Sequence, residues 1–151
     1  MTPVTLDTNT ATRLRIAFAR LNRRLGPTDA ATRAGLTPTR IAILLHLARS
    51  GPIRLSTLAE SEGINPTMLS RSVGQLTDDG LVSRSSDLGD RRAAWVELTP
   101  KGTRLVEKMR RERTDALNLA LERLIPEHRH DLESALPALE ELAEAIKERR
   151  P

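Results

Sequence analysis

Apolar side chains recur at every third or fourth position along most of this chain, the spacing that lines one face of an α-helix. Two Thr-Pro pairs, which begin at Thr37 and Thr99, mark helix starts, because threonine caps a helix and proline is tolerated in its first turn. The pattern predicts helices over about residues 14–25, 38–50, 56–62, 66–79, 100–125 and 127–149. We expect the stripe Ile41, Leu44, Leu45 and Ala48 to be buried in the second of these helices.

Apolar and polar residues alternate in the stretch after the fourth predicted helix, and this pattern is typical of strands. It predicts strands at 81–85 and 93–98, joined by a turn over 87–92. The expected fold class is therefore mainly α with a small β-hairpin, in which a helix-turn-helix precedes the hairpin and further helices flank both.

The helix-turn-helix is predicted from a short helix at 56–62, a breaking Gly63 and a second helix that Asn65 can cap. In the second helix Leu69, Val73 and Leu76 form an inward stripe. The opposite surface is polar and carries Asn65, Thr67, Ser70, Arg71, Gly74 and Gln75. Small and hydrogen-bonding groups with one arginine suit a helix that reads base edges in the major groove of DNA. The same surface also fits the solvent-facing side of an ordinary amphipathic helix.

The turn of the hairpin carries two adjacent arginines, Arg91 and Arg92, after Asp90. An arginine at such a tip can enter a minor groove, where the narrow walls focus negative potential. Asp90 can accept hydrogen bonds from Arg92 and fix its direction. Alone, such a pair is most simply a solvated turn, but after a helix-turn-helix it favours a DNA contact.

Composition narrows the function classes. The net charge of +4 is too small to identify a nucleic-acid binder by itself, although the acidic excess falls in residues 105–151 and leaves the first two-thirds basic. Phe18 and Trp95 are the only aromatic residues, so the chain lacks the stacking platforms that binders of single-stranded nucleic acid use. A duplex is the better nucleic-acid partner.

Other chemistries find no support in the sequence. The chain has no cysteine, which excludes disulfides and thiolate zinc sites, and it has no phosphate loop or hydrolase motif, so we expect no enzyme and no cofactor. His128 and His130 are two apart and cannot share a helical face, and His46 is distant in sequence, so no metal site is expected. No secretion signal or spanning apolar run appears, which predicts a cytoplasmic protein without a membrane anchor.

One continuous run, residues 55–102, resembles the winged helix-turn-helix of the multiple-antibiotic-resistance regulator (MarR) family. The matching pieces are "LSTLA", a recognition helix that holds "SR", then "LTDDGLVSR", the wing "DRR" and "LTPKG". The segment "LTPTRIAILLHLA" before it is similar to a further helix of that family.

The resemblance implies roles for particular residues. Asn65, Pro66, Thr67, Ser70 and Arg71 would lie in the major groove, and Gln75 extends the same polar surface. Asp90 and Arg92 match the wing's Asp-x-Arg, whose arginine reaches the minor groove, and Arg91 would meet a phosphate. Arg84 matches the arginine that closes the first wing strand. The scarcity of aromatic residues argues against a pocket for a phenolic ligand, so the effector stays unidentified.

The sequence also predicts a dimer. Apolar stripes at 14–25, 116–124 and 132–146 exceed what a small winged domain can cover, and a leftover apolar helix face usually marks an interface. An intramolecular bundle is the alternative. We expect an N-terminal dimerisation helix and linker at 1–36, a winged DNA-binding domain at 37–99 and C-terminal dimerisation helices at 100–151.

The predicted function is a homodimeric, sequence-specific transcription regulator, acting as a repressor on a pseudo-palindromic operator and relieved by a small-molecule effector. Its two half-sites would lie about one helical turn, ~34 Å, apart. The alternative is a protein-interaction module that uses a winged domain without specific DNA binding.

Overall fold

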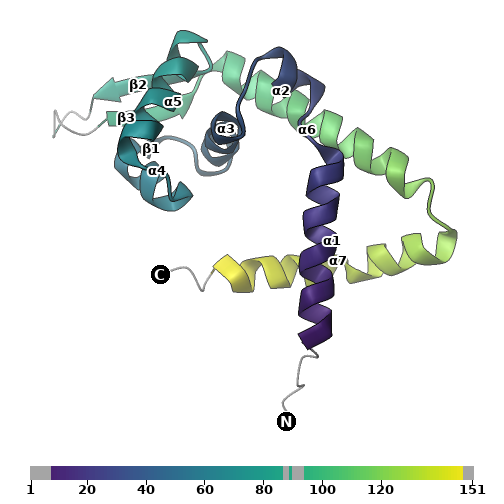
Figure 1. Ribbon diagram of the computed structural model, residues 1–151. Coiled ribbons are helices and arrows are strands. Elements are labelled where there is room, and N and C mark those ends of the chain that lie inside the picture. The colour runs from purple at the N-terminus through teal and green to yellow at the C-terminus, as the bar shows by residue number, and fades with distance from the viewer. Residues whose placement is uncertain (1–7, 87–88, 90–93, 148–151) are drawn as a thin grey trace. The chain divides into compact units, whose positions relative to one another are not determined.

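The computed structural model describes residues 8–86, 89 and 94–147, which form two compact units that divide after Arg113. The fold is mainly α with a small sheet, as the sequence predicts (Figure 1). The elements are α1 (Thr8–Leu25), α2 (Asp29–Arg33), α3 (Pro38–Ser50), β1 (Ile53–Arg54), α4 (Leu55–Glu62), α5 (Pro66–Asp78), β2 (Val82–Ser86), β3 (Ala94–Leu98), α6 (Pro100–Leu121) and α7 (Pro126–Lys147).

The predicted helix caps are confirmed. Thr37 Oγ1 accepts a hydrogen bond from the backbone N–H of Arg40 at 3.4 Å, which caps α3. Asn65 caps α5 through its side-chain oxygen, and Gly63 ends α4 in the left-handed region with φ of 64°. Thr99 Oγ1 accepts from the backbone N–H of Gly102 at 3.1 Å at the start of α6. These starts and stops were predictable because each depends on residues within three or four positions.

Two short elements were not predicted. Helix α2 has five residues and buries Ala30 and Ala31, and the hydroxyl of Thr28 caps it by accepting from the N–H of Ala31 at 3.2 Å. Strand β1 has two residues and pairs with β3, so the sheet has three antiparallel strands in the order β1-β3-β2. Elements this short carry no periodicity of their own, since only their tertiary partners make them regular.

Several predicted boundaries were also wrong. Helix α1 begins at Thr8 rather than Leu14. Its first turns were not predicted because they are polar and show no apolar stripe. Helix α6 ends at Leu121, about four residues before the predicted end. Strand β2 is displaced by one residue, to Val82–Ser86, and pairs with β3 so that Val82 lies opposite Leu98 and Ser86 opposite Ala94. Strand β3 ends at Leu98 as predicted, and its predicted first residue, Ala93, lies outside the described residues.

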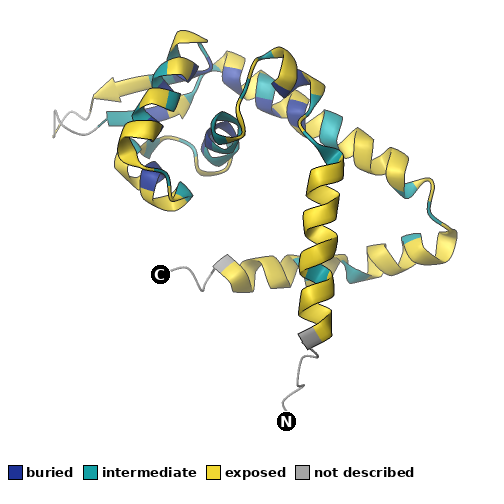
Figure 2. Ribbon diagram, in the orientation of Figure 1, coloured by how far each residue is buried: buried dark blue, intermediate teal, exposed yellow. Residues whose placement is uncertain are grey.

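The core lies in the first unit, where α3 is packed against α4, α5 and β3 (Figure 2). The predicted stripe of α5 is confirmed, since Leu69, Val73 and Leu76 are completely buried. The predicted stripe of α3 was partly wrong: Ile43 and Leu47 are fully buried alongside Leu44. The other predicted members, Ile41, Leu45 and Ala48, are only partly buried. A helix with neighbours on several sides buries more than one face, and a single stripe cannot describe it.

The charged run "EKMRRERTD" in the middle of α6 does not form the fully exposed neck that its composition suggests. Met109 is buried, and Glu112 accepts a hydrogen bond from the backbone N–H of Ala30 at 2.8 Å. Arg113 donates to the carbonyl of Gly26 at 2.8 Å. The segment around α2, which was not predicted, therefore covers this part of α6. The charged side chains of Glu112 and Arg113 in α6 form hydrogen bonds with backbone groups of that segment.

The start of α6 is joined closely to the end of α5. The backbone N–H of Thr99 donates to the carbonyl of Leu81 at 3.1 Å, and the hydroxyl of Thr99 donates to the carbonyl of Gly80 at 2.7 Å. Lys101 donates to the carbonyl of Asp79 at 2.7 Å. Gly102 is buried against Leu81, and a Cβ added to it would overlap the Leu81 carbonyl. The absence of a side chain at Gly102 is what lets the two segments approach this closely.

We predict that Gly102→Ala lowers the free energy of unfolding by about 2 kcal/mol or more, because the new methyl group meets rigid backbone. Gly74→Ala is the matched control: it also lies inside a helix, and no atom lies within 4 Å of its added Cβ. The control should gain up to about 1 kcal/mol from helix propensity. Thermal and denaturant unfolding of both variants measures the difference, and equal stability of the two variants would contradict the close contact.

Candidate nucleic-acid interface

The angle between α4 and α5 is set by a short turn. The N–H of Gly63 donates to the carbonyl of Glu60 at 3.2 Å, and that of Ile64 donates to the carbonyl of Ala59 at 3.0 Å. Asn65 then begins α5, and its Oδ1 accepts from the N–H of Thr67 at 2.9 Å. Every step of this reversal is hydrogen-bonded, so α5 leaves the turn in one direction.

A second contact holds the end of α4 in place. His46 Nδ1 in α3 lies 2.6 Å from Glu62 Oε1, and both side chains are largely buried. His46, which is distant in sequence from the other two histidines, thus has a structural partner. Among the residues that the structure describes, no group of three or more histidine, aspartate or glutamate side chains could hold a metal ion.

The face of α5 opposite its buried stripe is open to solvent. Asn65, Pro66, Thr67, Arg71 and Gln75, all predicted site residues, are exposed, whereas Ser70 is only partly so. Positions 67, 71 and 75 follow the i, i+4 spacing and so lie along one strip of the helix. Arg71 is the one cation on this helix. The strip combines donors, acceptors and a single guanidinium.

Sequence reasoning missed Met68, whose side chain is 56% exposed in the first turn of α5. The signal was available, since position 68 lies outside the spacing of Leu69, Val73 and Leu76. The surface set was restricted to small groups, hydrogen-bonding groups and one arginine, and Met68 belongs to none of these classes.

The base of the hairpin is fixed by pairing and by one ring contact. Arg84, a predicted site residue, is exposed on β2 opposite Val96. The guanidinium of Arg54 lies 5.6 Å from the ring centroid of Trp95, its partner across β1 and β3, which is a cation–π distance. The remaining predicted wing residues, Asp90, Arg91 and Arg92, lie outside the described residues.

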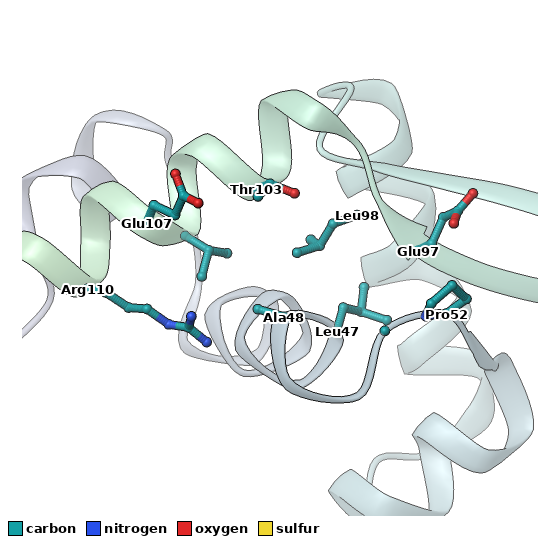
Figure 3. Close-up of a pocket in the computed structure, with 10 residues that line it drawn as sticks. Leu47, Ala48, Pro52, Glu97, Leu98, Thr103, Glu107 and Arg110 are labelled. Atoms are coloured by element: carbon teal, nitrogen blue, oxygen red, sulfur yellow. The ribbon is translucent and has the colours of Figure 1, made fainter.

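A cavity of about 350 Å³ lies between α3, β3 and the first half of α6 (Figure 3). Its apolar lining includes Leu47, Ala48, Pro52, Leu98 and Val106, and its polar lining consists of Glu97, Thr103, Glu107 and Arg110. Residues from three segments far apart in sequence meet here, so no local motif could have predicted it. The lining can accept an amphipathic small molecule.

No helix in the described parts of the chain combines the length and the apolar character that crossing a bilayer requires. The buried hydrophobic core lies in the same unit as the helix-turn-helix.

Comparison with known proteins agrees with this geometry. The family model described as "MarR family" matches residues 36–94. The HTH-type transcriptional regulator Mb0904 of Mycobacterium bovis is 30% identical over 129 residues, which cover 85% of this chain and 89% of the relative.

Two solved structures have the same fold. The transcriptional regulator Tm0710 from Thermotoga maritima has a TM-score of 0.76 at 23% identity, with 95% of this chain and 100% of that chain covered. NadR in complex with 4-hydroxyphenylacetate has a TM-score of 0.61 at 24% identity, with 92% and 97% covered.

Proposed function

Because this chain belongs to the MarR family and is a DNA-binding transcriptional regulator with a winged helix-turn-helix, we propose that it acts as a homodimeric repressor of a pseudo-palindromic operator. In this proposal each α5 enters a major groove, and the two half-sites lie about one helical turn apart. The observation that carries it is the exposed strip of α5, whose opposite face is completely buried. A helix held this firmly can present its polar groups without rearrangement.

The chemistry of the strip supports a reading role. The Oδ1 atom of Asn65 is already used by the N–H groups of Thr67 and Met68, so its amide presents Nδ2 donors to the outside. Phosphate oxygens and base acceptors suit such donors. Arg71 can donate both of its terminal groups to the O6 and N7 atoms of guanine. The N-terminus of α5 adds a partial positive charge that favours a nearby phosphate.

The proposed wing contact rests on the sequence and on the pairing that ends the hairpin. Ser86 and Ala94 are opposite each other, so the hairpin strands stay paired up to its turn. We propose that Arg92 reaches the minor groove, that Asp90 holds it, and that Arg91 and Arg84 meet the sugar-phosphate backbone.

Exposed apolar side chains support the proposed dimer. Every large apolar residue described as exposed, Met68 excepted, lies in α1 or beyond position 116. They are Ile16, Phe18, Leu21, Leu117, Leu119, Ile125, Leu132, Leu136, Leu142 and Ile146. Such surfaces rarely stay in water on a monomer. We assign residues 1–36 and 100–151 to dimerisation and 37–99 to DNA binding.

Relief by a small molecule is part of the proposal. NadR, which has a similar fold, forms a complex with 4-hydroxyphenylacetate, and here the cavity beside α6 has an aliphatic lining together with Glu97, Thr103, Glu107 and Arg110. A molecule bound there changes DNA affinity only if it prefers one separation of the two recognition helices over the other. The lack of aromatic lining favours an aliphatic effector over a phenol.

We predict that Arg71→Ala weakens binding to the specific duplex by about 1–3 kcal/mol while binding to random duplex changes much less, because a base contact is lost. The matched control, Arg111→Ala, removes an exposed arginine of α6. Titrations of both variants against both duplexes provide the comparison. Equal losses of Arg71→Ala on the two duplexes would reassign this residue to a phosphate contact.

We also predict that Leu136→Glu turns the dimer into a monomer and lowers operator affinity at least about tenfold, because each monomer then contacts one half-site. Ser134→Glu adds the same carboxylate at an exposed position of the same helix and should leave the dimer intact. Sedimentation equilibrium measures the mass of each variant. A dimeric Leu136→Glu with unchanged affinity would argue for an intramolecular role of this surface.

A further inference from the structure

Met68 is an apolar side chain in an otherwise polar reading strip. It is 56% exposed, whereas the large apolar residues that the structure describes elsewhere in the winged region are at least partly buried. Packing of the core does not require a methionine at this position, since Leu69, Val73 and Leu76 form the buried stripe of α5 without Met68. An isolated exposed methionine on an arbitrary surface would need no explanation, but this one lies in the first turn of the recognition helix.

Its position relative to the predicted reading residues is defined by helix geometry. Met68 precedes Arg71 by three positions and Gln75 by seven, so the three side chains project from the same strip. A side chain in the first turn of a recognition helix is among those that approach base edges most closely. With α5 in a major groove, Met68 would therefore face a base pair that neighbours the one met by Arg71.

The major groove offers one apolar group. Its edges consist of hydrogen-bond donors and acceptors, except for the C5-methyl group of thymine. Methionine cannot satisfy a base donor or acceptor well, and its flexible thioether chain can adjust to an apolar group within reach. A buried base edge with an unpaired donor or acceptor beside Met68 would instead cost free energy.

We propose that Met68 contacts the C5-methyl group of one thymine in each half-site, so that it specifies a T·A pair next to the pair read by Arg71. This inference rests on the proposed function, because it requires α5 to lie in the major groove. It adds an apolar determinant of specificity beside Thr67, Arg71 and Gln75, the polar residues of the strip.

The test begins with the operator itself. Selection from random duplexes with the wild-type protein yields the preferred half-site. Each thymine of one half-site is then replaced singly by deoxyuridine, which removes the methyl group and leaves every hydrogen-bonding group in place. Wild-type protein and Met68→Ala are titrated against each duplex, with Met68→Leu as the variant that keeps an apolar side chain.

The expected result is a single thymine whose replacement weakens wild-type binding about three- to fivefold, the effect of burying one methyl group. Met68→Ala should weaken binding to the thymine duplex by a similar factor and show no further loss on deoxyuridine. Met68→Leu should keep a measurable preference for thymine. Because the side chain is exposed, both variants should melt at the wild-type temperature.

Two failures are distinguishable. If the wild type selects a clear half-site but Met68→Ala responds to each deoxyuridine as the wild type does, the methyl contact is wrong and the regulator proposal stands. If the selection yields no sequence and all duplexes bind alike, the proposed operator recognition fails, and the inference about Met68 fails with it.

Discussion

The contact between the start of α6 and the end of α5 is the constraint on which the DNA-binding unit depends. Thr99 bonds to the carbonyls of Gly80 and Leu81 and caps α6 at the same time. Gly102 lets the helix reach the Leu81 carbonyl, which a side chain would prevent. The first ladder pair of the hairpin, Val82 and Leu98, lies immediately beyond this junction. Residues 79–81 and 99–102 thus position α5, α6 and the hairpin relative to one another.

This junction also connects the cavity beside α6 to the recognition helix within one unit. Helix α6 carries the cavity residues Val106 and Arg110, and its Lys101 donates to the carbonyl of Asp79, the residue that follows the recognition helix. At the other end of α5, the His46–Glu62 contact and the Gly63 turn restrict the approach from α4. If an effector changes the direction of α6, as proposed, these contacts at both ends of α5 would make the recognition helix move with it.

The local features of the fold were predictable from sequence, and the long-range ones were not. Thr37 and Asn65 cap helices through backbone groups within four residues, so both helix starts could be predicted. The spacing of Leu69, Val73 and Leu76 was sufficient to predict the buried face of α5. The hydrogen bond between Glu112 and the backbone of Ala30 in the short α2 joins positions that no sequence pattern connects. The charged composition of α6 therefore predicted exposure where part of the helix is covered.

The candidate site divides in the same way. The polar strip of α5 was predictable as the face opposite its buried stripe. Met68 was missed because only small and hydrogen-bonding groups and one arginine were assigned to that surface. The cavity of α3, β3 and α6 could not be predicted, since its lining combines residues 47–52, 97–98 and 103–110. Helical spacing could have identified Met68, whereas the cavity depends on tertiary proximity alone.

The most direct measurement is a titration of the protein against the duplex that lies upstream of its own gene, beside a scrambled duplex of equal length, at about 50 and 200 mM salt. Arg92→Ala is titrated alongside. The account predicts tight binding to the native duplex that weakens steeply with salt, because phosphate contacts release counterions. It also predicts that Arg92→Ala loses this binding. Weak binding that is equal for the two duplexes, here and after selection from random sequences, would contradict it and leave a protein partner as the ligand of the winged domain.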